Sequence, residues 1–355
     1  VSSSAAASAL SAAERAALDR THAGALLGSD AAMVAVLPRV WRGTLLSLDA
    51  MEPRIQAAGL RAFRELSRFT MRHCNVVGEM NASSGSAGVS LSGGGSGAAV
   101  RGTRGSVSAA SIGTARALLA ATLPWILSEG LNHANKLARQ LAVLTLRDLV
   151  RCAGPLVAPH VVSLVPALLR AVSSLEPGVL AYLQSHANDE VGNAAEAASA
   201  NDFGVAMGRG DVERLRSDVA RASPMEEALS LCVRHTDWRV AKKNGFVPDL
   251  AAKLAALVRS SVGASFLATR TSTSRFIVAF AAAAPKSAVK AAGVPLLRAL
   301  LDGVRSEKES ALVRRGFVEA AGALAKHGAK SGSVGKFVEG IVEMHRNALA
   351  GTKVS

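Results

Sequence analysis

The stretch from Arg221 to Phe280 constrains the fold more than any other, because its apolar positions return every three or four residues. It reads as helix, turn, helix, turn, helix, with Trp238 to Gly263 as the second block. One side of that block carries Asp249, Lys253 and Arg259. The opposite side carries Val247, Leu250, Ala251, Leu254, Leu257 and Val258. Helices that are half core and half surface need similar neighbours stacked on each side.

Comparable helix pairs recur along the chain with a common layout. A proline lies inside the first helix, an aspartate lies at the turn, and a basic residue lies early in the second helix. The layout is complete at Pro38, Asp49 and Arg54, and again at Pro295, Asp302 and Arg314; Pro124 with Lys136, and Pro166, follow part of it. This resembles a HEAT repeat. We therefore predict an all-α fold, a HEAT/armadillo-type α-solenoid of stacked antiparallel helix pairs, with about 40 residues per unit.

Two stretches interrupt the periodic pattern and define the expected domain organisation. The Gly/Ser-rich stretch before Ser111 would lose too much chain entropy on ordering to be held by what it can bury. The expected segments are a flexible or capping N-terminal segment at 1–28, a HEAT-like helix pair at 29–77, a disordered insertion at 78–111, HEAT-like repeats at 112–187, an irregular insertion at 188–210 and HEAT-like repeats at 211–355.

Two further expectations concern buried side chains. In the second helix of the first pair, we expect the buried side to be Ile55, Ala58, Leu60, Phe63, Leu66 and Phe69. Three cysteines lie far apart within helical patterns and have the character of reduced, buried thiols of a nucleocytoplasmic protein: Cys74, Cys152 and Cys232.

Composition agrees with packed helices and points to an acidic partner. Hydrophobic residues make up 49% and aromatic residues only 4%, which favours Ala/Leu/Val helices over a β-sandwich. We expect no membrane-spanning segment; the apolar run from Phe276 to Ala284 stops at Pro285, short of the roughly 18 residues that a span needs. The formal net charge of +14 makes an acidic partner plausible.

Four blocks in order resemble the proteasome adaptor and scaffold family, very large HEAT-repeat proteins that bridge the proteasome core particle and its regulatory particle. They are SSLEPGVLAYL (173–183), ARASPMEEALSLCVRHTD (220–237), VPDLAAKLAALVRSSVG (247–263) and RTSTSRFIVAF (270–280). The resemblance covers roughly Thr114 to Leu324. It implies a non-catalytic adaptor that binds both proteasome particles, in the cytoplasm and nucleus. The two insertions and the high alanine content depart from the family pattern.

No motif in the sequence predicts catalysis, and we expect no enzyme, cofactor, metal or small-molecule substrate. Neither a GxSxG nor an HExxH motif occurs, and the cysteines have no CxxC spacing. The tract from Gly93 to Gly97 lacks the Gly-Lys-Ser/Thr ending of a phosphate-binding loop. Glu226 and Glu227 follow Ser223 as in a helix capping box, which explains them without an active site.

The basic residues are the feature that bears on partners. Arg54, Arg270 and Arg314 occupy equivalent early positions, where an internal ladder with aspartates of neighbouring turns is favoured over a shared edge. The candidate protein-interface residues have no obvious carboxylate nearby and are Lys242, Lys243, Arg275 and Arg315. A solvated face is the plain alternative. The alternative function is a transport or nucleic-acid-associated scaffold that binds through its basic face, although aromatics are sparse and no nucleic-acid motif appears.

Overall fold

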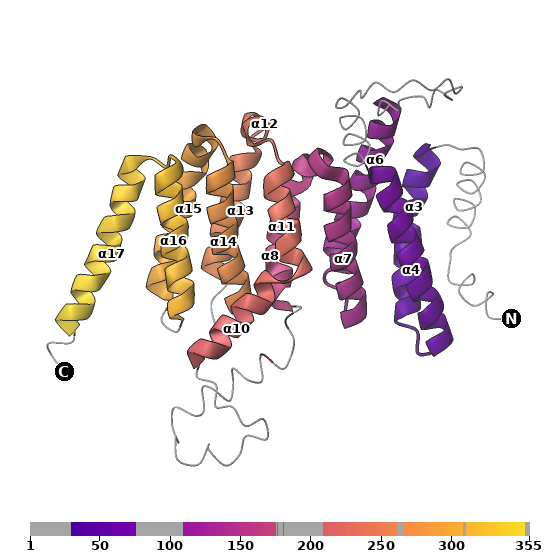
Figure 1. The fold of residues 1–355 in the computed structure, drawn as a ribbon, viewed down its shortest axis with the longest axis horizontal. Helices are drawn as coiled ribbons and strands as arrows, with labels where there is room; N and C mark the ends of the chain where they lie inside the picture. Colours follow the sequence, from indigo (N-terminus) through magenta and orange to yellow (C-terminus); the bar gives the residue numbers. More distant parts are fainter. Residues whose placement is uncertain are drawn as a thin grey trace, which may run out of the picture. The chain divides into compact units, whose positions relative to one another are not determined.

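A computed structural model describes residues 30–75, 109–174, 176, 180, 209–260, 266–307 and 310–351, and these residues form helices and turns without a strand. The chain divides into two compact units, Val1–Leu156 and Val157–Ser355. In both units the helices pack as stacked pairs (Figure 1). The expected all-α HEAT-type fold is therefore confirmed.

Unit 1 is two helix pairs that pack on one another. Helix α3 (Asp30–Leu48) packs on α4 (Pro53–Cys74) and on α6 (Ala109–Trp125), while α4 packs on α7 (Lys136–Ala153). A single π-helical turn, η1 (Ile126–Gly130), ends α6 just after Pro124. The expected prolines inside α3 and α6, Pro38 and Pro124, are both present in helix.

The centre of unit 1 is an aromatic cluster. Trp41 of α3 is completely buried and stacks on Trp125 of α6, with ring centroids 5.1 Å apart. Phe63 of α4 meets Trp41 edge-on at 4.9 Å. One ring from each of three helices therefore fixes how those helices pack, at a site where aromatic pairs add to the energy of burial.

The buried side of α4 differs from the expected one. Ile55 and Ala58 are exposed, and the buried residues are Gly59, Phe63, Ser67, Thr70 and Cys74. A Cβ added at Gly59 would lie 2.6 Å from Ser47 Oγ, so α3 and α4 approach too closely for large side chains there. The hydroxyls of Ser67 and Thr70 donate to the carbonyls of Phe63 and Leu66, both at 2.8 Å, which makes their burial tolerable.

Unit 2 is a longer two-layered stack. One layer holds α8 (Val161–Ser174), α13 (Phe246–Ser260), α15 (Lys286–Ser306) and α17 (Ser331–Gly351). The other holds α11 (Pro224–His235), α14 (Leu267–Ala283) and α16 (Ala311–His327). Helix α10 (Arg209–Arg221) packs on α14, the short α12 (Trp238–Lys243) packs on α13 and α15, and a 3₁₀ turn, η2 (Gly154–His160), leads into α8.

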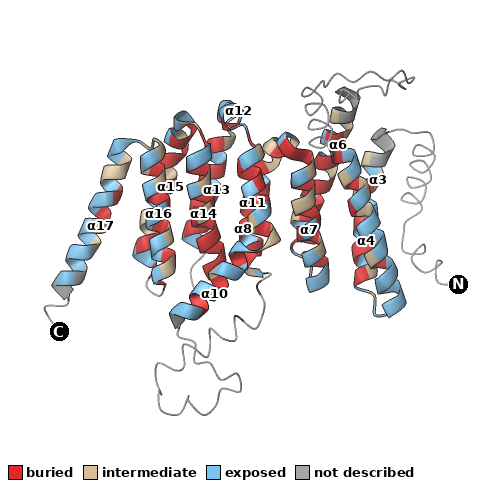
Figure 2. Ribbon diagram, viewed as in Figure 1, coloured by how far each residue is buried: buried red, intermediate tan, exposed pale blue. Residues whose placement is uncertain are grey.

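The expected second block of the central stretch is two helices. Helix α12 ends at Lys243 and α13 begins at Phe246, with Gly245 between them at φ 76°, a value that glycine adopts readily. Asp237 caps α12 by accepting from the amides of Arg239 and Val240. All six apolar positions expected on the inner side of α13 are buried. Figure 2 colours buried residues red, and they recur along the helices of unit 2.

Several expected segments lie partly or wholly outside the described residues. They include the N-terminal segment 1–28, most of the insertions 78–111 and 188–210, and the helix expected just after Pro177. Helix α6 begins at Ala109 and α10 at Arg209, so the last residues assigned to each insertion are helical.

One apolar stretch is longer than any expected from the sequence. Within the described residues, Lys136–Ser174 has the length and hydropathy of a membrane-crossing helix. The stretch comprises α7, η2 and α8, with Gly154 at φ 52° after α7, and half of its most apolar window is buried in the protein. Core helices of this kind pass the same test, so the finding is weak evidence for a span.

Candidate interaction surface

Lys242 and Lys243 are the predicted interface residues that fit the expectation best. Both are exposed in the last turn of α12, and neither makes an ion pair with another described residue. The C-terminal end of a helix carries a partial negative charge, so both ammonium groups also interact favourably with α12 itself. As interface residues they stay a prediction.

Arg275 has a carboxylate partner, contrary to the expectation. Its Nε donates to Glu226 Oε1 at 2.8 Å, and its two terminal nitrogens donate to Ser217 and Ser272. The side chain is about a quarter exposed. Arg275 therefore ties α14 to α10 and α11, and the 49 residues that separate it from Glu226 hid the pair in the sequence.

Arg315 is also paired, with Glu319 one turn further along α16. The Nε to Oε1 distance is 2.8 Å, and both side chains are largely exposed. A pair of this type adds a few tenths of a kcal/mol, roughly 0.3–0.5 kcal/mol in helices. The i, i+4 spacing was the sequence signal that could have revealed it.

The structure does not bring the four candidates into one patch. Gly316 lies against Ser274, so Arg275 and Arg315 lie at the same level of the neighbouring helices α14 and α16. The two lysines belong to α12, which packs on α13 and α15 in the other layer. A single positive strip through all four residues is therefore not formed.

Arg270 is the one member of the expected arginine ladder that is buried. It forms an ion pair with Glu307, in the connection between α15 and α16, and both side chains are at most 6% exposed. Arg54 and Arg314 are exposed and form no ion pair with another described residue. The predicted ladder of arginines with aspartates is wrong. The one buried arginine, Arg270, pairs with a glutamate, Glu307, in the connection between α15 and α16.

A second buried pair lies near the first. Arg216 of α10 binds Glu176 through two hydrogen bonds of 2.6 Å, and Ser310 donates to Glu213 Oε2 at 2.7 Å. Arg216, Glu213 and Ser310 are each at most 6% exposed. Bidentate arginine–carboxylate geometry is directional, so this pair fixes the position of α10.

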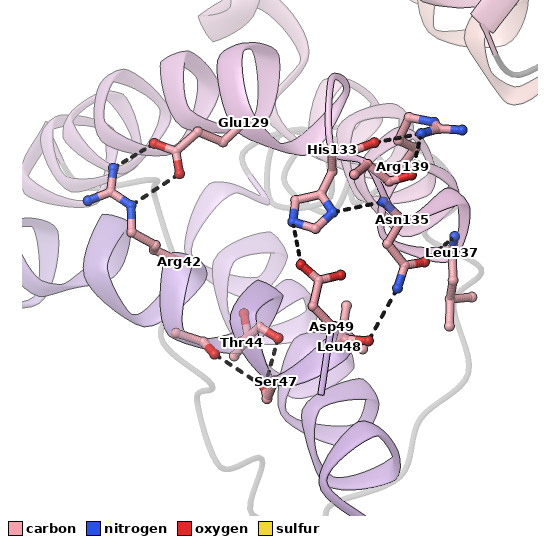
Figure 3. Close-up of polar contacts among 12 residues, drawn as sticks. Arg42, Thr44, Ser47, Leu48, Asp49, Glu129, His133, Asn135, Leu137 and Arg139 are labelled. Carbon is pink, nitrogen blue, oxygen red and sulfur yellow. Dashed lines mark hydrogen bonds and ion pairs between the residues drawn. The ribbon is translucent and has the colours of Figure 1, made fainter. Parts of the chain in front are cut away.

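Figure 3 shows polar contacts of unit 1, among them an exposed ion pair. Arg42 of α3 binds Glu129 through bonds of 3.1 and 2.6 Å, and this hydrogen bond lowers the pKa of the Glu129 carboxyl. Asp49 lies 3.3 Å from His133 Nε2. Asn135 caps α7 and also donates to the carbonyl of Leu48 at 3.2 Å, which joins the end of α3 to the start of α7.

The three cysteines are free thiols. Cys74 and Cys232 are buried, and burial raises the pKa of each to about 12. Cys152 is only half-buried; its pKa is raised mainly by burial and further by Asp148. The expectation of buried thiols thus holds fully for two of the three.

Surface grooves run between neighbouring helices of unit 2. They have volumes of about 480 Å³ between α8 and α13, 720 Å³ between α15 and α17, and 450 Å³ between α11 and α14. The α15–α17 groove is lined by four cations that are not among the predicted interface residues: Arg298, Arg305, Lys330 and Lys336. The one-heptad spacing of Arg298 and Arg305 was the available signal.

Among the described residues, no group of three or more histidine, cysteine, aspartate or glutamate side chains is placed to hold a metal ion. The features that remain are grooves and charges on a stack of helix pairs. The stacked helix pairs define a helical-repeat protein.

Comparison with known proteins gives the family. The model of the HEAT-repeat domain of the proteasome adapter and scaffold protein ECM29 matches residues 157–345, more than half of the chain, and the chain belongs to this family. The resemblance drawn from the four sequence blocks is confirmed.

Two relatives show how small a share of such proteins this chain covers. The human proteasome adapter and scaffold protein ECM29 is 26% identical over 268 residues, which is 76% of this chain and 11% of the relative. The Drosophila melanogaster proteasome-associated protein ECM29 homolog is 30% identical over 127 residues, 36% of this chain and 6% of the relative. The chain thus spans about a tenth or less of their length. No solved structure matches.

Proposed function

We propose that this chain is a proteasome-associated scaffold segment that works by binding and without turnover. The observation that carries the proposal is the coincidence of the family match, residues 157–345, with unit 2, Val157–Ser355. The relatives are named as an adapter and scaffold and as a proteasome-associated protein. The finer proposal is that the chain helps to tether the core particle to the regulatory particle, in the cytoplasm and nucleus.

The distribution of charge in unit 2 supports a role that depends on surfaces. Its buried arginines are matched to carboxylates within the stack, as in Arg270 with Glu307 and Arg216 with Glu176. Both pairs are buried within the stack, so a partner at the surface has little access to them. The cations left to interact with a partner lie on exposed helix faces, which suits recognition by electrostatic complementarity.

The test uses purified proteasomes and the whole 355-residue chain. We expect the immobilised chain to retain holoenzyme at physiological salt and to slow its separation into core and regulatory particles on native gels. Retention of separated core particle and of separated regulatory particle, each measured alone, tests tethering. Retention of one particle only would remove the tethering proposal, and retention of neither would remove the proteasome proposal.

The alternative of a nucleic-acid scaffold is tested in parallel. A labelled DNA duplex and a single-stranded RNA are titrated with the chain at several salt concentrations. Binding that persists at physiological salt, and that loses affinity steeply as the salt is raised further, would support the alternative, because cations that contact phosphates release counterions. We expect weak binding that does not survive physiological salt.

A further inference from the structure

The groove between α15 and α17 combines an apolar floor with a positive rim. Its floor is formed by Val294, Leu297 and Leu301 of α15 and Phe337 of α17. Leu297 and Phe337 are buried, whereas Val294 is 46% exposed and open to a ligand. The helices close together at Gly340, where an added Cβ would lie 2.7 Å from Leu301 Cδ2, so the groove is narrow at that end.

The rim of this groove is more positive than negative. Arg298, Lys330 and Lys336 are exposed and make no ion pair with another described residue. Arg305 is held by Glu343 at 3.2 Å in an exposed pair, and Asp302 is the one carboxylate among the lining residues. Gly332 and Ser333, in the first turn of α17, also line the groove, so the positive end of this helix dipole adds to the field.

We propose that the α15–α17 groove binds an acidic segment of a partner protein, with carboxylates on the rim cations and one apolar side chain on the floor. Charge complementarity selects acidic chemistry, since three rim cations have no carboxylate of their own. The floor selects a peptide over a nucleic acid. A phosphodiester backbone carries no aliphatic side chain to cover Val294 and Leu301, and the floor has no exposed aromatic face on which a base could stack.

This inference does not depend on the proposed proteasome association, because it is tested with a peptide alone. The probe is a fluorescein-labelled nine-residue peptide of glutamates around a central leucine, and its binding to the whole chain is followed by fluorescence anisotropy. The groove variant is Arg298→Glu with Lys336→Glu. The matched control is Arg61→Glu with Arg64→Glu, which makes the same charge change at two exposed residues of α4.

We expect the groove variant to lower affinity at least tenfold and the control to lower it less than about twofold. Replacing the central leucine of the peptide by serine is expected to weaken binding to the unaltered chain several-fold. The milder Arg298→Gln with Lys336→Gln variant should give an intermediate loss, and circular dichroism checks that each variant is folded. Unaltered helix content with reduced binding supports the proposal.

Three results would overturn it. Equal losses in the groove and control variants would mean that the peptide responds only to net charge. Equal affinity for the leucine and serine peptides would remove the role of the floor. A DNA oligonucleotide that displaces the peptide, and itself loses affinity only in the groove variant, would assign the groove to nucleic acid.

Discussion

Unit 1 and unit 2 are both stacks of helix pairs, yet they fill their interiors with different chemistry. Unit 1 gathers Trp41, Phe63 and Trp125 at its centre and keeps the Arg42–Glu129 pair on its surface. Unit 2 buries two arginine–glutamate pairs and a helix, α14, whose residues from Thr269 to Ser274 are all buried despite being polar. The desolvation cost of folding therefore differs between the two units, although both are stacks of helix pairs.

The hydroxyls of α14 explain how so polar a helix can be buried. Thr271, Thr273 and Ser274 donate to carbonyls three or four residues earlier in the helix, at 2.7 to 3.1 Å. Thr269 instead donates to the carbonyl of Leu169 in α8 at 2.9 Å. Apolar contact is non-directional, whereas these bonds and the ion pairs depend on geometry, so unit 2 specifies its helix positions more strictly than burial alone would.

The largest expected effect tests the aromatic side of the comparison. Trp41→Ala should lower the free energy of unfolding of unit 1 by roughly 3–5 kcal/mol, because it removes a completely buried ring and leaves a cavity. Hydrogen exchange read helix by helix should show the loss in α3 and α4. The control Leu46→Ala, at a side chain that is 66% exposed, should change stability by less than about 0.5 kcal/mol. A loss below about 1 kcal/mol for Trp41→Ala would contradict the aromatic core.

The next effect tests the ionic side. Arg270→Leu should destabilise unit 2 by about 3 kcal/mol, because Glu307 is left buried without its arginine. Adding Glu307→Leu should restore most of that loss, although the amide of Ser310 then loses its acceptor. Arg315→Leu, which breaks an exposed pair, serves as the control and should cost no more than about 0.5 kcal/mol. Denaturant unfolding of the unaltered chain and of the three variants measures these differences. A double variant as unstable as Arg270→Leu alone would refute the pairing.

A smaller effect comes from histidines of unit 2. Burial lowers the pKa of His160 and of His235 below the ordinary 6.5. The unfolded chain therefore binds more protons than the folded chain just below pH 6.5, so the stability of unit 2 should fall as the pH falls through that range. His160→Gln with His235→Gln should flatten this part of the stability–pH curve. An unchanged curve would show that the histidines do not titrate differently on unfolding.

The smallest effect is on thiol reactivity and leaves stability untouched. At pH 8, an alkylating reagent should modify Cys152 first, since Cys74 and Cys232 are buried with pKa values of about 12. The two buried thiols should react at least tenfold more slowly until denaturant is added. Cys152→Ser should abolish the fast phase seen by mass spectrometry. Fast modification of Cys232 in the folded chain would place α11 outside the core.

Whether a feature of the fold could be predicted from the sequence depended on how far apart along the chain the interacting residues lie. The inner side of α13 was predictable, because six apolar residues at helical spacing leave one solution. The inner side of α4 could not be predicted in this way. Gly59 is buried because α3 and α4 approach closely there, and Ser67 is buried with its hydroxyl hydrogen-bonded, and neither residue is hydrophobic. Local periodicity records neither of these causes.

The same limit governed the candidate site. The pair of Arg315 with Glu319 is local and could have been read from its spacing. The partners of Arg270 and Arg275 come from other helix pairs, so only the stacked fold reveals them. The α15–α17 groove likewise unites residues whose helices are separated by α16, and its cations could be grouped only once the packing was known.

The central claim is that the chain works through the surface of unit 2, and lysine-directed cross-linking of the whole chain to purified proteasomes tests it most directly. The account predicts cross-links to proteasome subunits from exposed lysines of unit 2, among them Lys242, Lys243, Lys253, Lys330 and Lys336. Mass spectrometry identifies both ends of each link. Cross-links confined to Lys136 of unit 1, or no cross-links to any proteasome subunit, would contradict it.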